Sequence, residues 1–395
     1  MQASYGSYSR LDVQVVFARI ILARTVRAAA FGALSVALAL YLAQRGFSTV
    51  AIGFVLTIAL LAGAASSMAT DAMVRRLGRR ATLEVSALAM CAAGLLLSLS
   101  SNAFVVMLAA LLGTVSAGGQ EVGPFGAIEQ HAIAETDGSR GSAHRFALYN
   151  LAGALAMALG ALIAAELSSS EVLWYYAASG IALMLVYSNL NSRVLPDSVQ
   201  APLDAHTGRR NKGNLEVLTA LFGLDALAGG FVVQSFIAYW LHLRYGVDQH
   251  AIGILFFGSS ILTAISMLVA AKIAQRIGLL RTMVFTHLPS NVLLCLIPLM
   301  PTYPLASAML LARFALSQMD VPTRQALTMQ VVEPAERFRA AGWTNAVRPA
   351  AAAISPVLAG LTIASAPVGL PFFIAGGLKI LYDIILYAKF RGEKR

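Results

Sequence analysis

The sequence predicts an all-α membrane protein with twelve transmembrane helices, arranged as two pseudo-symmetric bundles of six. Three observations support this fold class. Apolar segments of about 20 residues recur along almost the whole chain, which is the length that a helix needs to cross the ~30 Å hydrocarbon core. Only 12% of the 395 residues are charged, against about a quarter in a soluble domain. Lys and Arg are concentrated in the short segments between the apolar ones.

The twelve expected spans begin and end where charged or turn-forming residues interrupt the apolar runs. They are 16–44, 50–70, 80–100, 103–133, 143–166, 172–192, 214–243, 250–273, 279–300, 303–332, 338–363 and 367–390. We expect helices because a helix satisfies all of its backbone polar groups within one segment. The alternating apolar and polar pattern of a barrel strand is not seen in these segments.

The distribution of basic residues predicts the orientation of the chain. Twenty Lys and Arg residues lie in the terminal segments and loops of one side, and Arg45 and Arg244 alone lie in the loops of the other. A cytoplasmic excess of Lys and Arg sets membrane topology, so both termini are expected in the cytoplasm, in a bacterial plasma membrane. The net charge of +10 is then explained by loops that face anionic lipid headgroups, and no nucleic-acid partner is expected. The N-terminal segment has no signal-peptide pattern, so the first span is expected to remain in place.

A polar segment at 193–213 divides the chain into two halves that repeat one another. We predict an N-terminal bundle over 1–192, a cytoplasmic linker over 193–213 and a C-terminal bundle over 214–395. The tripeptide Ala-Ile-Gly at 51–53 returns at 251–253, and Arg76-Leu-Gly78 returns as Arg276-Ile-Gly278. Glu121 and Asp320 correspond at an offset of 199. Because each half has an even number of spans, these are parallel repeats.

The basic loop between the second and third spans resembles the signature loop of the major facilitator superfamily. Gly78, Arg79 and Arg80 fit its glycine and the two basic residues that follow. Arg75 stands where an acid is expected, and Asp71 stands where the pattern has its first glycine. The resemblance implies twelve spans in two bundles, with spans one, four, seven and ten lining a central cavity. It also implies a loop that docks on a helix end in one conformation and releases in another, although the same charges could simply retain the loop in the cytoplasm.

Charged residues inside the spans are the candidate functional residues, because each costs at least about 2.5–3.5 kcal/mol in hydrocarbon. Counting inward from the estimated ends of the spans, we single out nine of them: Arg24, Arg27, Glu121, Glu129, Asp225, Arg313, Asp320, Arg324 and Arg348. Eight of them fall in the four spans that the resemblance assigns to the cavity.

These charges are expected to pair around a common polar chamber. We expect Arg27 or Arg24 to neutralise Glu121, and Arg324 or Arg313 to neutralise Asp225. Glu121 and Asp320 are the preferred proton-coupling carboxylates. The alternative for all of them is a static ion pair between helices, and this alternative is favoured for Glu129.

Other polar residues could orient a solute in the chamber. They are Gln120, Tyr149, Asn150, Gln234, Gln318 and Asn345. Each could equally form a hydrogen bond between helices. His131 and His287 are interpreted as hydrogen-bonded helix residues, and no metal or cofactor is expected.

The sequence therefore predicts a secondary transporter and no enzyme. No GxxxxGK[ST] loop and no catalytic motif is present in it. The expected cargo is a small polar or anionic organic solute, the expected coupling ion is H⁺ and the expected state is a monomer. Two alternatives stay open, namely a drug/proton efflux antiporter and a non-transporting receptor or assembly factor on a carrier scaffold.

Overall fold

The computed structural model describes residues 10–190, 212–321, 323–324, 327, 337–365 and 369–391. Side chains are described throughout these ranges except at 10–13, 134–143, 212–215, 271, 337–346 and 365. The predicted linker at 193–213 lies almost wholly outside the described residues, so the domain boundaries stay a prediction. Every regular element in the described ranges is helical.

Seven helices precede residue 191 and form the first bundle. They are α1 (Arg10–Gln44), α2 (Thr49–Met68), α3 (Thr70–Leu77), α4 (Arg79–Leu99), α5 (Ala103–Leu111), α6 (Phe125–Glu166) and α7 (Ser169–Ser188). α1 is the most enclosed of them, because it packs against α6 and α7 in its own bundle and against α9 of the other.

The second bundle follows residue 211. It contains α8 (Lys212–Gly230), α9 (Gln234–Tyr245), α10 (Gln249–Ile277), α11 (Leu279–Leu296), the 3-10 turn η1 (Ile297–Leu299), α12 (Tyr303–Ser317), α14 (Arg337–Ser365) and α15 (Leu370–Phe390). Within this bundle α14 and α15 pack against α8, and α15 packs against α11.

The all-α membrane fold is confirmed, while the count of twelve spans is not fully confirmed. The described residues contain ten helices long and apolar enough to cross a membrane, and α12 is a shorter apolar helix. Large apolar side chains such as Phe104 and Leu268 are exposed on the outside of the bundles, where lipid would cover them.

The expected fourth and fifth spans, 103–133 and 143–166, have different boundaries in the structure. α5 ends at Leu111, and α6 is one helix from Phe125 onward. The segment between them contains Gly113, Gly119 and Gly123, all with positive φ. Glycine adopts this left-handed conformation readily, and three such residues end the helix that the apolar pattern predicted.

The expected seventh span is also interrupted, at residues 231–233 between α8 and α9. Directly after this break, Ser235 forms hydrogen bonds with two backbone carbonyl groups of the first bundle. Its amide donates to Ala117 O at 3.1 Å, and its Oγ lies 2.8 Å from both Ala117 O and Ser35 O. Ser35 and Ser235 are 200 residues apart, the same offset as that of the repeated Ala-Ile-Gly at 51–53 and 251–253, so the two halves meet here at equivalent positions.

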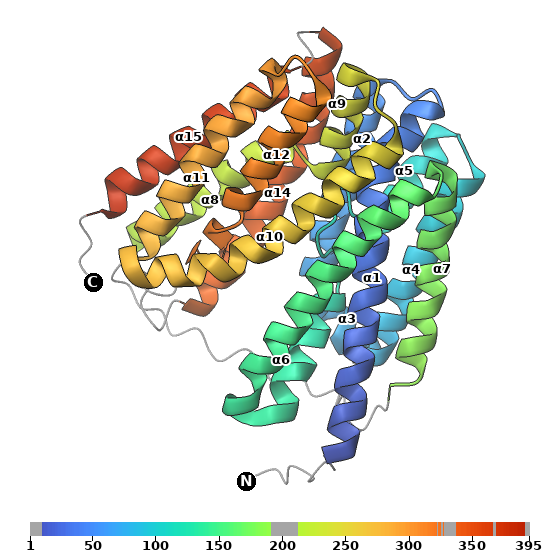
Figure 1. Cartoon of the computed structure of the whole chain (residues 1–395). Helices are drawn as coiled ribbons and strands as arrows, with labels where there is room; N and C mark the ends of the chain where they lie inside the picture. Colours follow the sequence, from blue (N-terminus) through green and yellow to red (C-terminus); the bar gives the residue numbers. More distant parts are fainter. Residues whose placement is uncertain are drawn as a thin grey trace.

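The bundles are in contact at the end opposite to the start of α1. Figure 1 shows them meeting near α2 and α9 and diverging toward the side where α1 begins and α15 ends. α2 packs against α14, and α6 against α10. Three glycines make these contacts: a Cβ on Gly53 would lie 2.5 Å from Pro356 O, one on Gly253 2.7 Å from Ala161 O, and one on Gly360 2.7 Å from Thr49 O. We call this group the glycine seal.

Candidate functional site

Arg27 of α1 is the centre of a buried network in the first bundle. Its guanidinium donates two hydrogen bonds to Glu129, at 2.9 and 2.6 Å, and one to Glu121 at 2.6 Å. The hydroxyls of Tyr149 and Tyr187 donate to the two oxygens of Glu129, at 2.8 and 2.6 Å. Arg27 is fully buried, and the paired fork of hydrogen bonds offsets the cost of burying its charge.

Arg24 and Glu121 form the partly exposed edge of this network. Arg24 pairs with Glu121 one turn of α1 before Arg27. The side chains of Arg24 and Glu121 are 17% and 24% exposed, whereas those of Arg27 and Glu129 are 0% and 1% exposed. The Arg24 guanidinium lies directly against Gly153 of α6, where a Cβ would lie 2.4 Å from its Nε. The N-terminal network therefore has a buried anchor and an accessible edge.

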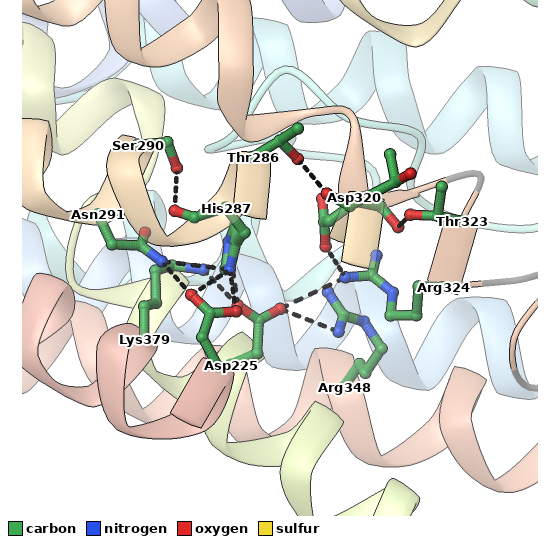
Figure 2. A network of polar contacts seen from close by, with 12 residues as sticks. Asp225, Thr286, His287, Ser290, Asn291, Asp320, Thr323, Arg324, Arg348 and Lys379 are labelled. Atoms are coloured by element: carbon green, nitrogen blue, oxygen red, sulfur yellow. Dashed lines mark hydrogen bonds and ion pairs between the residues drawn. The ribbon is translucent and has the colours of Figure 1, made fainter. Parts of the chain in front are cut away.

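Asp225 of α8 is the centre of a second network, in the other bundle (Figure 2). Its Oδ1 lies 2.5 Å from Lys379 Nζ, and its Oδ2 lies 3.1 Å from Arg348 and 3.5 Å from Arg324. Arg324 also pairs with Asp320 at 2.5 Å. Here too the exposure is graded, from 4% for the Asp225 side chain to 13% for Arg324 and 27% for Arg348.

His287 of α11 joins Asp225 to a further buried carboxylate. Its Nδ1 lies 2.9 Å from Asp383 Oδ1 on α15, and its Nε2 lies 3.8 Å from Asp225 Oδ1. Asn291 donates to Asp383 Oδ2 at 3.0 Å. His287, Asp383 and Asn291 are all buried, so three helices hold a polar cluster inside the bundle.

The predicted site residues form two networks, one in each bundle. The structure places both Arg24 and Arg27 beside Glu121, and Arg324 beside Asp225. Arg313 is buried but contacts neither Asp225 nor Asp320, and its Nε has no hydrogen-bond partner. Among the described side chains of these networks, every ion pair joins residues of the same bundle.

The predicted solute-orienting residues are spread over different environments. Tyr149 is buried in the N-terminal network, while Gln120 and Asn150 are exposed. Gln234 follows the break between α8 and α9, and its buried Nε2 has no hydrogen-bond partner. Gln318 is half-buried at the end of α12. The side chain of Asn345 lies outside the described part of the chain.

Lys379 and Asp383 were not recognised as site residues in the sequence, and His287 was assigned a structural role alone. Lys379 and Asp383 are ionisable residues inside the twelfth expected span, one helical turn apart. The criterion that selected the other buried charges applies equally to them. Their role depends on contacts with α8 and α11, which a single sequence does not show.

The basic loop contains one buried and several exposed charges. Gly78 separates α3 from α4 with φ of 83°, and Gly278 separates α10 from α11 with φ of 89°. Arg79 is buried and has a partner, and Arg80 pairs with Glu84 at 2.8 Å. Asp71 and Arg75 are exposed on α3. The repeat thus preserves the turn, which requires glycine at positive φ, more closely than it preserves the charges.

Comparisons with known proteins agree with this fold. Residues 218–395 match the family model of the Major Facilitator Superfamily. An uncharacterised membrane protein of Saccharomyces cerevisiae is 25% identical over 426 residues, covering 96% of this chain and 94% of the yeast protein. The crystal structure of the nucleoside transporter NupG superimposes with a TM-score of 0.77 at 14% identity, over 96% of this chain and all of NupG.

Two further solved structures have the same architecture. The human organic anion transporter MFSD10 superimposes with a TM-score of 0.67 at 17% identity, over 95% of this chain and 99% of its own. A D-xylose–proton symporter gives 0.69 at 13% identity, over 93% and 97%. The resemblance seen in the sequence is therefore confirmed as a likeness: residues 218–395 match the family model of the superfamily, and nearly the whole chain has the fold of these solved transporters.

Proposed function

We propose that this chain moves a small polar or anionic organic solute across the membrane by alternating access, coupled to protons. One observation carries the choice of solute. The accessible edge of the C-terminal network consists of two arginines, Arg324 and Arg348, while the carboxylate that they share is almost fully buried. Guanidinium groups at an accessible edge suit a carboxylate, a phosphate or a hydroxyl-rich solute, because each presents hydrogen-bond acceptors to them.

The proposed site lies where the accessible edges of the two networks face the space between the bundles. Arg24 and Glu121 would contribute from the first bundle, and Arg324 and Arg348 from the second. Arg27, Asp225 and Asp320 would hold these groups in position from the buried side. Tyr149, Gln120, Asn150, Gln234, Gln318 and Asn345 are the proposed solute-orienting residues.

The arrangement of the bundles supports an alternating-access cycle. The glycine seal closes the end opposite to the start of α1, and the bundles diverge at the other end. With both termini in the cytoplasm, as the basic loops predict, this would be an inward-facing state. Asp71, Arg75, Gly78, Arg79 and Arg80 are the proposed conformational loop of the cycle. The proposal includes a monomeric state and a bacterial plasma membrane. The relative reported above is a yeast protein and does not test either point.

The test begins with ligand-induced thermal shifts and continues with transport. Purified protein would be screened against nucleosides, organic anions and pentoses, the solute classes named for the structural neighbours. A compound that raises the melting temperature would then be measured for uptake into proteoliposomes, with and without an imposed pH gradient. We expect accumulation of an anionic or hydroxyl-rich compound that requires the pH gradient.

Two variants test the proposed coupling carboxylates, and the panel tests the alternatives. Glu121→Gln and Asp320→Asn should each alter the dependence of uptake on the pH gradient, and unchanged dependence in both would remove them as coupling groups. Export of lipophilic cations in exchange for protons would replace the proposal with a drug/proton antiporter. Binding without transport of any compound would favour a receptor on a carrier scaffold.

A further inference from the structure

His287 is the one described imidazole whose two ring nitrogens both face buried carboxylates. Nδ1 is 2.9 Å from Asp383 Oδ1 and Nε2 is 3.8 Å from Asp225 Oδ1. A neutral imidazole carries a single N–H, and the hydrogen bond to Asp383 assigns it to Nδ1. The Nε2 lone pair then points toward a carboxylate, an arrangement that becomes favourable only when Nε2 gains a proton. Among the described residues no group of three His, Cys, Asp or Glu side chains could hold a metal ion, so a metal site does not explain this geometry.

We propose that His287 is a further proton site of the transport cycle, beside the coupling carboxylates Glu121 and Asp320 proposed above, and that it acts through Asp225. The inference rests on the proposed proton-coupled transport and names a proton site within it. The step adds one N–H bond at Nε2 and one positive charge. Imidazole is the side chain whose charge ordinarily changes near neutral pH.

The charges around His287 determine how its protonation would affect solute binding. Asp225 Oδ1 is shared by His287 and Lys379, and Oδ2 is shared by Arg348 and Arg324. An imidazolium at His287 would supply part of the charge that neutralises Asp225. The attraction of Asp225 for Arg348 would weaken, and Arg348, the most exposed member of the network, would become available to a solute.

The other groups around His287 fit this interpretation. From α15 come Asp383, Lys379 and Tyr382, whose ring lies 5.9 Å from the imidazole. On α12, Arg313 is a buried cation that lies beyond ion-pair distance of Asp225 and Asp320. Lys272 and Arg276 of α10 are exposed. Four cations (Arg313, Arg324, Arg348 and Lys379) thus stand against three carboxylates (Asp225, Asp320 and Asp383). A proton at His287 would add to this excess of positive charge and would favour the binding of an anion. Coupling between two binding events is reciprocal, so a bound anion would favour protonation to the same extent.

The experiment follows the distance between the bundles as a function of pH, with the proton itself as the ligand. Arg45 and Arg244 are exposed, lie at the end closed by the glycine seal and belong to opposite bundles. Nitroxide labels would be placed at Arg45→Cys and Arg244→Cys, with Cys91→Ala and Cys295→Ala removing the native thiols. Electron double resonance in lipid nanodiscs would give the distance distribution between about pH 5.5 and 8.5. We expect the populations to titrate with one proton.

The His287→Gln variant should lose this titration, and His144→Gln should keep it. His144 is exposed on α6 and serves as the matched control. A titration that survives in His287→Gln overturns the inference while leaving proton coupling in place. A parent protein that does not respond to pH contradicts the proposed proton coupling itself, and the inference with it.

Two further variants should shift the titration midpoint in opposite directions. They test the inference even if the His287→Gln variant does not fold. Asp383→Asn removes an anion beside the imidazolium, so the midpoint of the change in label distances should move to lower pH. Lys379→Gln removes a cation that competes for Asp225 Oδ1, so the midpoint should rise. A general loss of stability would not move the midpoint in both directions, and unchanged midpoints in both variants overturn the inference.

Discussion

Arg27 and Asp225 occupy neighbouring positions in the two repeats and carry opposite charges, yet each is the centre of its bundle's buried network. At the repeat offset of 199, Arg27 corresponds to Ala226. Arg27 is surrounded by two carboxylates and two tyrosine hydroxyls, and Asp225 by Lys379, Arg348, Arg324 and His287. Each half therefore has a buried charge at nearly the same place along its first helix, and the two charges have opposite signs.

The first prediction concerns the stability that Arg27 contributes. Arg27→Met should lower the free energy of unfolding by about 3–5 kcal/mol, because Glu129 would stay buried without its cation. Thermal unfolding of purified protein would measure the loss. Arg80→Gln is the control, since the side chains of Arg80 and Glu84 are 42% and 29% exposed and ion pairs in contact with solvent contribute only about 0–1 kcal/mol. Equal losses in the two variants would show that Arg27 does not anchor the bundle.

The second prediction compares two tyrosine hydroxyls that differ in the charge of their acceptor. Tyr187 donates to the Glu129 carboxylate at 2.6 Å, and Tyr41 donates to the neutral carbonyl of Leu97 at 2.8 Å. Tyr187→Phe should cost about 1.5–3 kcal/mol and Tyr41→Phe about 0.5–1.5 kcal/mol, because hydrogen bonds to charged groups are stronger. The same unfolding measurement applies. A larger loss for Tyr41→Phe would contradict the assigned importance of the Glu129 network.

The sequence predicts features that are set within one segment better than features that depend on contacts between distant helices. Recurring apolar runs predict most helices, because the membrane imposes length and polarity on each segment separately. Gly113, Gly119 and Gly123 interrupt the fourth span, and an apolar pattern is insensitive to the left-handed backbone that they adopt. The charges of the site were recognised from their burial cost. The sequence predicts charge pairs within each half, but it does not predict that Lys379, Asp383 and His287 join Asp225, because this depends on which faces of α8, α11 and α15 lie opposite one another.

The third prediction is a double-mutant cycle on Asp225 and Lys379. Lys379→Met alone should be tolerated better than Asp225→Asn alone, because Asp225 keeps Arg348 at 3.1 Å, whereas Asp225→Asn leaves three cations and His287 without a shared anion. Adding Lys379→Met to Asp225→Asn should restore part of the loss, with a coupling energy of about 0.5–3 kcal/mol. Strictly additive changes in the melting temperature would mean that the 2.5 Å contact contributes no net interaction.

The fourth prediction tests the glycine seal. A Cβ at Gly53 would lie 2.5 Å from Pro356 O, and one at Gly253 would lie 2.7 Å from Ala161 O, in both cases against backbone of the opposite bundle. Gly53→Ala and Gly253→Ala should therefore lengthen the distance between labels at Arg45→Cys and Arg244→Cys by favouring the conformation in which this end is open.

Gly377→Ala is the matched control, because Gly377 lies in a helix with no atom within 4 Å of the added carbon. It should leave the distances unchanged and, if anything, stabilise α15 by about 0.5–1 kcal/mol. The clash at Gly53 and Gly253 exists only while the bundles are in contact, so a protein that opens this end can relieve it by moving. A protein that never opens this end would instead melt at a lower temperature with unchanged label distances, and that result would contradict alternating access.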